Sequence, residues 1–154
     1  MYPEEMVMPM ARELTNEGFV ELKSAEETEN AIKNNAGTML LVVNSVCGCA
    51  AGSARPGIIE SLSGEKKPDH LYTVFAGVDM EATRKAREFL LPYPPSSPAI
   101  ALFKDNELVH MIERHQIEGR PAEIIAKHLE QASLPSPQRL ITWGRLIIAA
   151  HLLD

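Results

Sequence analysis

Residues 38–49 read TMLLVVNSVCGC, an apolar run that leads directly into a pair of cysteines. The apolar part is rich in β-branched valine and is bounded by turn-forming residues, which is typical of a strand buried on both faces of a sheet. Small residues and then apolar ones follow over 50–62 and predict a helix that is kinked at Pro56. Cys47 and Cys49 are therefore expected at a strand-to-helix junction.

Strand and helix patterns alternate on both sides of this junction. Further strands are predicted at 71–77, 99–103 and 108–112. Helices are predicted at 3–16, 24–34, 80–91 and 119–131. Asp79 is the expected N-cap of the third of these helices, and the turn residues Asp105-Asn106 should join the last two strands as an antiparallel hairpin. The pattern predicts an α/β fold, in which a mixed sheet is flanked by helices on both faces.

The two ends of the chain differ in pattern. Met6, Met10 and Leu14 recur every four residues in the first helix, which predicts that this face packs in the core. Beyond Leu134 two prolines break the pattern and an apolar stretch follows. We predict one domain over 1–134 and a C-terminal extension over 135–154, which either docks on the domain or on a partner, or has no structural role.

Composition narrows the classes of function. The chain has 154 residues and a formal net charge of -6, with no block of basic residues, so neither nucleic acid nor an anionic membrane surface is an expected partner. The sequence shows no secretory signal and no apolar stretch of membrane length, and a cytoplasmic location is expected. A domain of this size buries an adequate core without crosslinks, so both cysteines are free for chemistry in a reducing compartment.

The cysteine pair is suited to thiol–disulfide exchange. A thiol exchanges with a disulfide only as its thiolate, and the start of a helix lowers a cysteine pKa because its N–H groups and dipole favour negative charge. Cys47 is therefore the expected nucleophile and Cys49, deeper in the helix, the expected resolving thiol. Gly48 and Ser45 complete the active-site turn, and a bent Cys-Gly-Cys segment is short enough for the two sulfurs to bond.

Two other functions use the same pair of thiols. Two cysteines bind Cu(I) or supply half of a zinc site, and His110 and His115 are the candidate remaining ligands. The spacing of these histidines does not point to the cysteines, so no metal ligand is assigned. An interaction module whose cysteines only sense oxidation is the third hypothesis. Catalytic turnover of a disulfide substrate would separate it from an enzyme.

Several longer motifs resemble the bacilliredoxin family. The resemblance covers about residues 1–132 and leaves out the extension. It is carried by six segments, which are MYPEEMV at 1–7, VNSVCGCAAG at 43–52, ARP at 54–56, PPSSP at 94–98, IERH at 112–115 and IEGRP at 117–121.

The resemblance implies a thioredoxin-like fold in which a CGC motif replaces the usual CxxC motif. It also implies a thiol–disulfide oxidoreductase that removes bacillithiol from S-bacillithiolated proteins, with disulfide isomerase activity also attributed to the family. Cys47 matches the residue that accepts bacillithiol as a mixed disulfide, and Cys49 matches the residue that resolves it. The expected partners are S-bacillithiolated client proteins, bacillithiol as redox co-substrate and the reductase that recycles it. No bound cofactor is expected.

The candidates for binding the substrate are Pro98 and Ser97, which the resemblance implies, and Arg55, which is proposed from its place in the helix after the cysteines. Pro98 occupies the place of the cis-proline that faces the active cysteine in thioredoxin-like proteins, and the Ser97 backbone would pair with an extended client. Arg55 is a candidate for the malyl carboxylates of bacillithiol, and the alternative is a solvent-exposed helical arginine. Glu113 and His115 are weaker candidates for proton transfer than for solvated positions in a loop or at a strand end.

Overall fold

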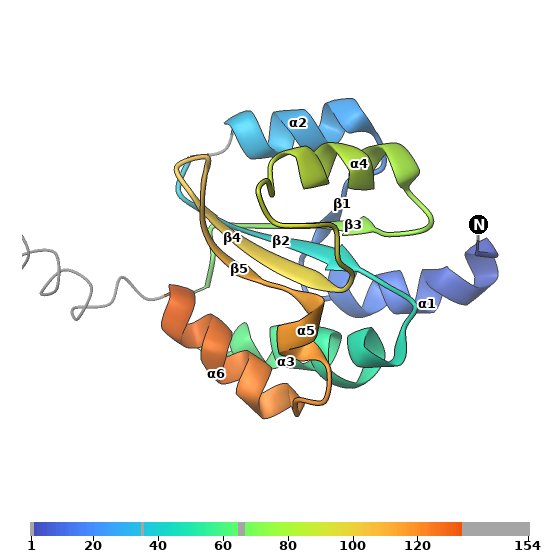
Figure 1. Cartoon of the computed structure of the whole chain (residues 1–154), viewed down its shortest axis with the longest axis vertical. Helices are drawn as coiled ribbons and strands as arrows, with labels where there is room; N and C mark the ends of the chain where they lie inside the picture. The colour runs from blue at the N-terminus through green and yellow to red at the C-terminus, as the bar shows by residue number, and fades with distance from the viewer. Residues whose placement is uncertain (1, 35, 65–66, 134–154) are drawn as a thin grey trace, which may run out of the picture.

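The computed structural model describes residues 2–34, 36–64 and 67–133, so the predicted extension over 135–154 lies outside the described residues. Five strands form one sheet in the order β1-β3-β2-β4-β5 (Figure 1). The strands are β1 (Val20–Glu21), β2 (Thr38–Asn44), β3 (His70–Phe75), β4 (Ala99–Lys104) and β5 (Glu107–Ile112). The helices are α1 (Glu4–Thr15), α2 (Ala25–Asn34), α3 (Arg55–Ser61), α4 (Met80–Glu88), α5 (Arg114–Ile117) and α6 (Ala122–Ser133), with a π-helical turn, η1 (Ala50–Ala54).

The strand that precedes the cysteines lies at the centre of the sheet. It pairs parallel with β3 and antiparallel with β4, where Val43 lies opposite Ala99. All but the first residue of β2 are buried, which confirms the predicted strand with two covered faces. The predicted hairpin of β4 and β5 is also confirmed, and its turn residues Asp105 and Asn106 have φ angles of 47° and 70°, the left-handed conformation that a tight hairpin turn requires.

Helices cover both faces of the sheet, as predicted. Figure 1 shows α2 and α4 on one face, and α1, α3 and α6 on the other. The alternation of side chains along β2 divides the core accordingly. Met39, Leu41 and Val43 pack with the first pair of helices, and Leu40 and Val42 pack with the second group.

Helix α1 buries fewer residues than the spacing of its methionines predicts. Val7 and Leu14 are its buried apolar residues, whereas Met6 is 45% exposed. The prediction that the Met6 side chain lies in the core is therefore wrong, because a helix at the edge of a layer buries only the residues that face the sheet. The start of α2 matches the sequence, because the Glu27 N–H donates to Ser24 Oγ over 3.1 Å, the contact expected of a capping serine.

The segment after the cysteines differs from a plain helix. Its first part is the π-helical turn η1, in which the Arg55 N–H donates to the carbonyl of Ala50, five residues earlier. Pro56 follows at once, and because proline has no N–H it cannot continue an α-helical bond to Gly52. Strand β1 and helix α5 were not predicted, since two and four residues are too short to show a periodic pattern.

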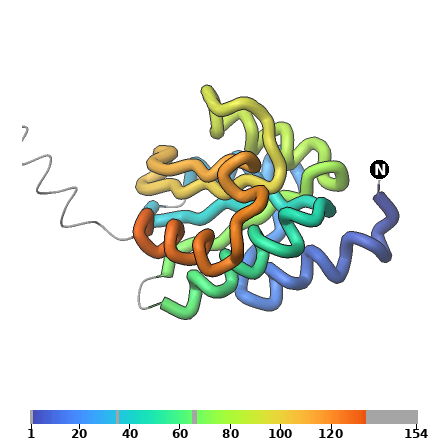
Figure 2. Tube along the Cα trace, turned by 60° about the horizontal axis from the view of Figure 1, so that its bottom comes forward, coloured from blue at the N-terminus to red at the C-terminus, as the bar shows by residue number. Residues whose placement is uncertain are grey.

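The ends of the described chain lie apart. Helix α1 begins and helix α6 ends on opposite sides of the molecule (Figure 2), and β2 ends on the α1 side (Figure 1). Among the described residues, no helix combines the length and the apolar character that crossing a bilayer requires.

Candidate active site

The two cysteines lie where β2 passes into the π-helical turn. Cys47 directly precedes the first helical residue, and its carbonyl accepts hydrogen bonds from the N–H groups of Ala50 at 3.1 Å and Ala51 at 3.2 Å. Cys49 lies in the first turn, and its sulfur is 2.6 Å from that of Cys47. The predicted strand-to-helix junction is confirmed. Both thiols are free and half-buried.

The surroundings of Cys47 favour its thiolate. Partial burial acts to raise the pKa of Cys47. Hydrogen bonds from the side chains of Cys49 and Ser45 and from the Ala50 N–H act in the opposite direction. The positive charge of Arg114 adds to them, so the pKa of Cys47 lies below that of an ordinary cysteine. A lowered pKa increases the share of the thiolate, which is the form of the thiol that acts as a nucleophile.

The surroundings of Cys49 favour its protonated form. Burial raises the pKa of Cys49, and the hydrogen bond to Cys47 and the charge on that sulfur raise it further. Arg114 lowers the pKa and Glu118 raises it, and the sum lies above the ordinary cysteine value. The two thiols therefore differ in the direction that thiol–disulfide exchange requires of a nucleophile and a resolving thiol.

Ser45 is held in place beside Cys47. Its N–H donates to Asn44 Oδ1 over 2.8 Å, and its own Oγ accepts a hydrogen bond from the Cys47 N–H over 3.2 Å. Gly48 is exposed, and a Cβ atom added to it would meet no atom within 4 Å. A side chain at this position would therefore extend into open space.

The loop before β4 lies next to this turn. Because Val43 pairs with Ala99, the preceding Pro98 lies alongside the segment that leads to Cys47. The Ser97–Pro98 peptide bond is cis, as the resemblance implies. The Leu91–Pro92 bond is also cis and was not predicted. The Ser97 carbonyl accepts a hydrogen bond from Arg114 Nη1 over 3.3 Å.

Arg114 is the site residue that the sequence reasoning missed. It opens helix α5, its side chain is 45% exposed, and its Nε donates to Glu118 Oε1 over 2.6 Å. Cys49 and Cys47 are among the groups that raise the pKa of Arg114, after the hydrogen bond to Glu118. The available signal in the sequence was its place in the IERH motif, between Glu113 and His115.

Those neighbouring residues have other roles. Glu113 caps helix α5, because its side chain accepts from the backbone at Gln116 while the Gln116 side chain accepts from the Glu113 N–H. His115 is 73% exposed, with its Nδ1 4.0 Å from Glu113 Oε2. The solvated position predicted for His115 is confirmed, and Glu113 belongs to a capping box.

Arg55 differs most from its predicted environment. Its side chain is 1% exposed, so the interpretation as a solvent-exposed helical arginine is wrong. The guanidinium contacts Glu13, Asn44 and the Ser45 carbonyl, all within the protein. No surface of Arg55 is open to the carboxylates of a ligand, whereas Arg114 is an exposed cation whose charge acts on both cysteines.

The zinc form of the metal alternative lacks its two further ligands within the described part of the chain. His110 Nε2 lies 2.8 Å from His128 Nε2, and His115 points into solvent on another element. Among residues 2–34, 36–64 and 67–133, no three or more His, Cys, Asp or Glu side chains form a group that could hold a metal ion. A Cys2His2 set from these residues is therefore not assembled.

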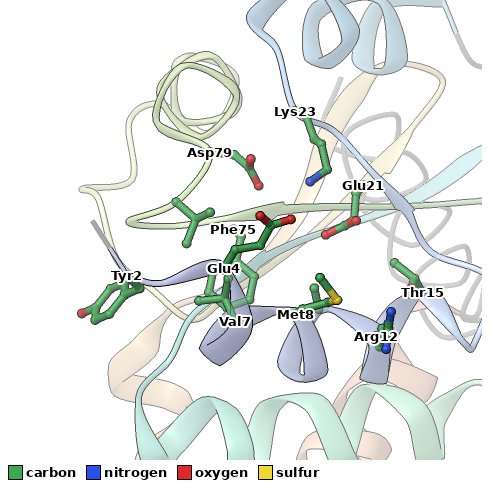
Figure 3. A pocket seen from close by; sticks show the side chains of 12 residues that line it. Tyr2, Glu4, Val7, Met8, Arg12, Thr15, Glu21, Lys23, Phe75 and Asp79 are labelled. Carbon is green, nitrogen blue, oxygen red and sulfur yellow. The ribbon is translucent and has the colours of Figure 1, made fainter.

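A cavity of about 550 Å³ lies beside α1, and its lining includes neither cysteine. Figure 3 shows the side chains of Glu4, Glu21, Lys23 and Asp79 gathered around it. Asp79 stands at the N-cap position of α4 as predicted, but its side chain makes no capping hydrogen bond. Burial raises the pKa of Asp79, with Lys23 acting against this shift and Glu21 in the same direction.

Comparison with known sequences points to one family. Residues 2–134 match the family model described as disulphide isomerase. A bacilliredoxin of Cytophaga hutchinsonii is 62% identical over 130 residues, which cover 84% of this chain and 96% of that protein. A bacilliredoxin of Halalkalibacterium halodurans is 55% identical over 131 residues, which cover 85% and 91%.

Comparison with solved structures identifies the fold. Mitochondrial thioredoxin 3 of Saccharomyces cerevisiae in its oxidised form superposes with a TM-score of 0.52 at 18% identity, over 79% of this chain and 96% of that one. Thioredoxin O2 of Arabidopsis thaliana gives a TM-score of 0.51 at 19% identity, over 77% and 97%. The predicted thioredoxin-like fold is therefore confirmed.

Proposed function

Because this chain belongs to the bacilliredoxin family, we propose that it removes bacillithiol from S-bacillithiolated proteins through Cys47 and Cys49. Family membership makes it a thiol–disulfide oxidoreductase. The observation that carries the division of roles is the position of Cys47 directly before the first helical residue, where the Ser45 side chain and the Ala50 N–H favour its thiolate and the Cys49 sulfur lies 2.6 Å away. The reaction belongs in the cytoplasm, where low-molecular-weight thiols maintain reducing conditions.

The first step is transfer of bacillithiol to the enzyme. The Cys47 thiolate attacks the bacillithiol sulfur of the mixed disulfide on the client. A new sulfur–sulfur bond joins Cys47 to bacillithiol, the old bond breaks, and the client leaves as a thiolate that takes a proton from water. No net oxidation occurs in this step, because one disulfide replaces another.

The second step releases bacillithiol. Cys49 loses its proton and attacks the Cys47 sulfur, so that bacillithiol leaves as a thiolate and an internal disulfide forms between the two cysteines. Two electrons from a thiol reductant, either bacillithiol itself or its reductase system, return the pair to dithiols. The negative charge on Cys47 is one of the causes that raise the pKa of Cys49, and this charge is removed when Cys47 forms the mixed disulfide.

Substrate contacts are assigned to the exposed side of the turn. The Ser97 backbone beside cis-Pro98 would pair with an extended client segment, in the manner of an added strand. Arg114 would attract the malyl carboxylates of bacillithiol, since it is an exposed cation close to both sulfurs. This assignment moves the carboxylate-binding role from Arg55, whose guanidinium is buried.

The test is mass spectrometry of the wild type, Cys47→Ala and Cys49→Ala after incubation with a bacillithiolated client. We expect Cys49→Ala to accumulate one bacillithiol on Cys47, and Cys47→Ala to leave the client modified. Removal of bacillithiol by Cys47→Ala at the wild-type rate would refute the assignment of the nucleophile.

Disulfide isomerisation is a second candidate activity, favoured by the description of the family model. It uses the same nucleophile on a client disulfide and does not require bacillithiol. Reactivation of a scrambled disulfide protein in buffer without bacillithiol tests it. Activity in this assay that depends on Cys47 but not on Cys49 would support isomerisation. If there is no activity, de-bacillithiolation remains the single proposed activity.

A further inference from the structure

Arg55 is fully buried and contacts Asn44 and Ser45, in the segment that precedes Cys47. The exchange reaction itself does not use it. Arg55 is the largest side chain in the described residues to be less than 2% exposed. Burying a guanidinium costs free energy unless an opposite charge lies close to it and its N–H groups make hydrogen bonds. Glu13, on helix α1, supplies the opposite charge, with its Oε2 at 2.5 Å from Arg55 Nε.

The other contacts of Arg55 reach the segment that carries Cys47. Nη1 donates to Asn44 Oδ1 over 2.9 Å and to the Ser45 carbonyl over 2.8 Å. Asn44 Oδ1 also accepts from the Ser45 N–H over 2.8 Å. Both backbone polar groups of Ser45 are therefore held, one through Asn44 and one by Arg55 directly.

Ser45 connects this network to the reacting sulfur. Its Oγ accepts from the Cys47 N–H over 3.2 Å, and its hydroxyl is one of the groups that favour the Cys47 thiolate. A hydroxyl can stabilise a thiolate only when its direction is fixed, because a hydrogen bond weakens steeply with misalignment. Its direction depends here on a backbone segment that Arg55 holds.

We propose that Arg55, anchored by Glu13, is a positioning residue that fixes the Asn44-Ser45 segment and so maintains the reactivity of Cys47. The inference rests on the proposed role of Cys47 as nucleophile. It links helix α1, through an ion pair between residues 42 positions apart, to a turn that α1 does not itself form. Arg55 acts through Ser45 and does not touch the substrate.

Two variants distinguish a positioning role of Arg55 from an effect of charge alone on Cys47. Arg55→Lys keeps the positive charge, but a lysine ammonium cannot reach the acceptors that the guanidinium fork bridges. If only charge matters, Arg55→Lys should leave Cys47 unchanged. Glu13→Ala removes a negative charge, which by Coulomb's law alone should favour the Cys47 thiolate and speed its reactions. If positioning matters, both variants should slow Cys47.

The experiment measures alkylation of Cys47 by iodoacetamide as a function of pH, with Cys47 and Cys49 quantified separately by peptide mass spectrometry. It needs no bacillithiol, so its outcome is independent of whether de-bacillithiolation is the activity. Glu17→Ala is the matched control for Glu13→Ala, since Glu17 is exposed and lies outside the network. Circular dichroism melting curves establish that each variant is folded at the assay temperature.

We expect Arg55→Lys to slow alkylation of Cys47 at pH 7 by about three- to tenfold and to move its pH profile upward. Glu13→Ala should slow it by about twofold relative to Glu17→Ala. Alkylation of Arg55→Lys at the wild-type rate would overturn the proposal. So would faster or unchanged alkylation of Glu13→Ala, which decides the matter if Arg55→Lys does not fold.

Discussion

Two arginines lie near the two cysteines and differ in burial and in the residues that they contact. Arg55 is 1% exposed and contacts Glu13, Asn44 and Ser45. Arg114 is 45% exposed, pairs with Glu118 and donates to the Ser97 carbonyl. The same residue type therefore serves two different purposes within one site.

The difference shows that burial, rather than proximity to the nucleophile, decides what an arginine does here. A buried guanidinium is committed to the acceptors that compensate its desolvation, and removing it leaves those acceptors unmatched. An exposed guanidinium keeps its hydration and remains available to a charged ligand, but each of its contacts contributes little to folding. Arg55 should thus affect stability and geometry, whereas Arg114 should affect charge and substrate.

The largest expected effect is on stability. Arg55→Met should lower the free energy of unfolding by about 2 to 4 kcal/mol, because Asn44 Oδ1 and the Ser45 carbonyl lose a donor and Glu13 loses its counter-ion. Urea denaturation followed by circular dichroism measures this difference. Arg114→Met is the matched control, and its unfolding midpoint should equal that of the wild type. Equal midpoints for the two variants would remove the distinction between buried and exposed sites.

An intermediate effect is expected on the nucleophile. Arg114→Met should slow alkylation of Cys47 at neutral pH by about threefold, because the positive charge that favours its thiolate is lost. Salt separates this effect from that of Arg55. In 1 M NaCl the Debye length falls to about 3 Å, so wild type and Arg114→Met should alkylate at similar rates, whereas the deficit of Arg55→Lys should persist. A deficit of Arg114→Met that is insensitive to salt would argue for a geometric role.

The elements that the sequence predicted are those with a local signal. The apolar run of β2, the Asp105-Asn106 hairpin and the strand-to-helix junction at Cys47 each depend on residues adjacent in the chain. Cis-Pro98 came from the family resemblance and not from local physics, since the sequence around an X-Pro bond does not specify its isomer.

The parts that the sequence did not predict depend on contacts between distant segments. Its neighbours in the sequence predict a surface position for Arg55. In the fold, helix α1 places Glu13 against it. Arg114 becomes a site residue only because α5 packs beside Ser97 and the cysteines. Charged side chains are ambiguous in a single sequence, because the same letter marks a solvated surface or a compensated buried site.

The smallest expected effect concerns the carboxyl group of Asp79. Lys23 offsets only part of the effect of its burial. Burial raises the pKa of Asp79, which lines the cavity beside α1. A folded-state pKa above the unfolded one means that this group favours folding while protonated, and that its contribution is lost as the pH rises through the folded pKa. Asp79→Asn cannot ionise, so it should melt about 1 or 2 °C higher than the wild type at pH 7, with no difference near pH 3.

Asp69→Asn provides a comparison of opposite sign. Hydrogen bonds from the Thr38 N–H and the Thr38 hydroxyl to its carboxylate lower the pKa of Asp69. Its contribution to stability is therefore present above the unfolded pKa and is lost as the pH falls through the folded one. Melting curves from pH 3 to pH 7 should show Asp69→Asn falling below the wild type as the pH rises, while Asp79→Asn rises above it. If the melting temperatures of the two variants shift in parallel with pH, local hydrogen bonding and burial do not set these two carboxyl groups apart. The role of burial inferred from the two arginines would then not extend to the acidic residues.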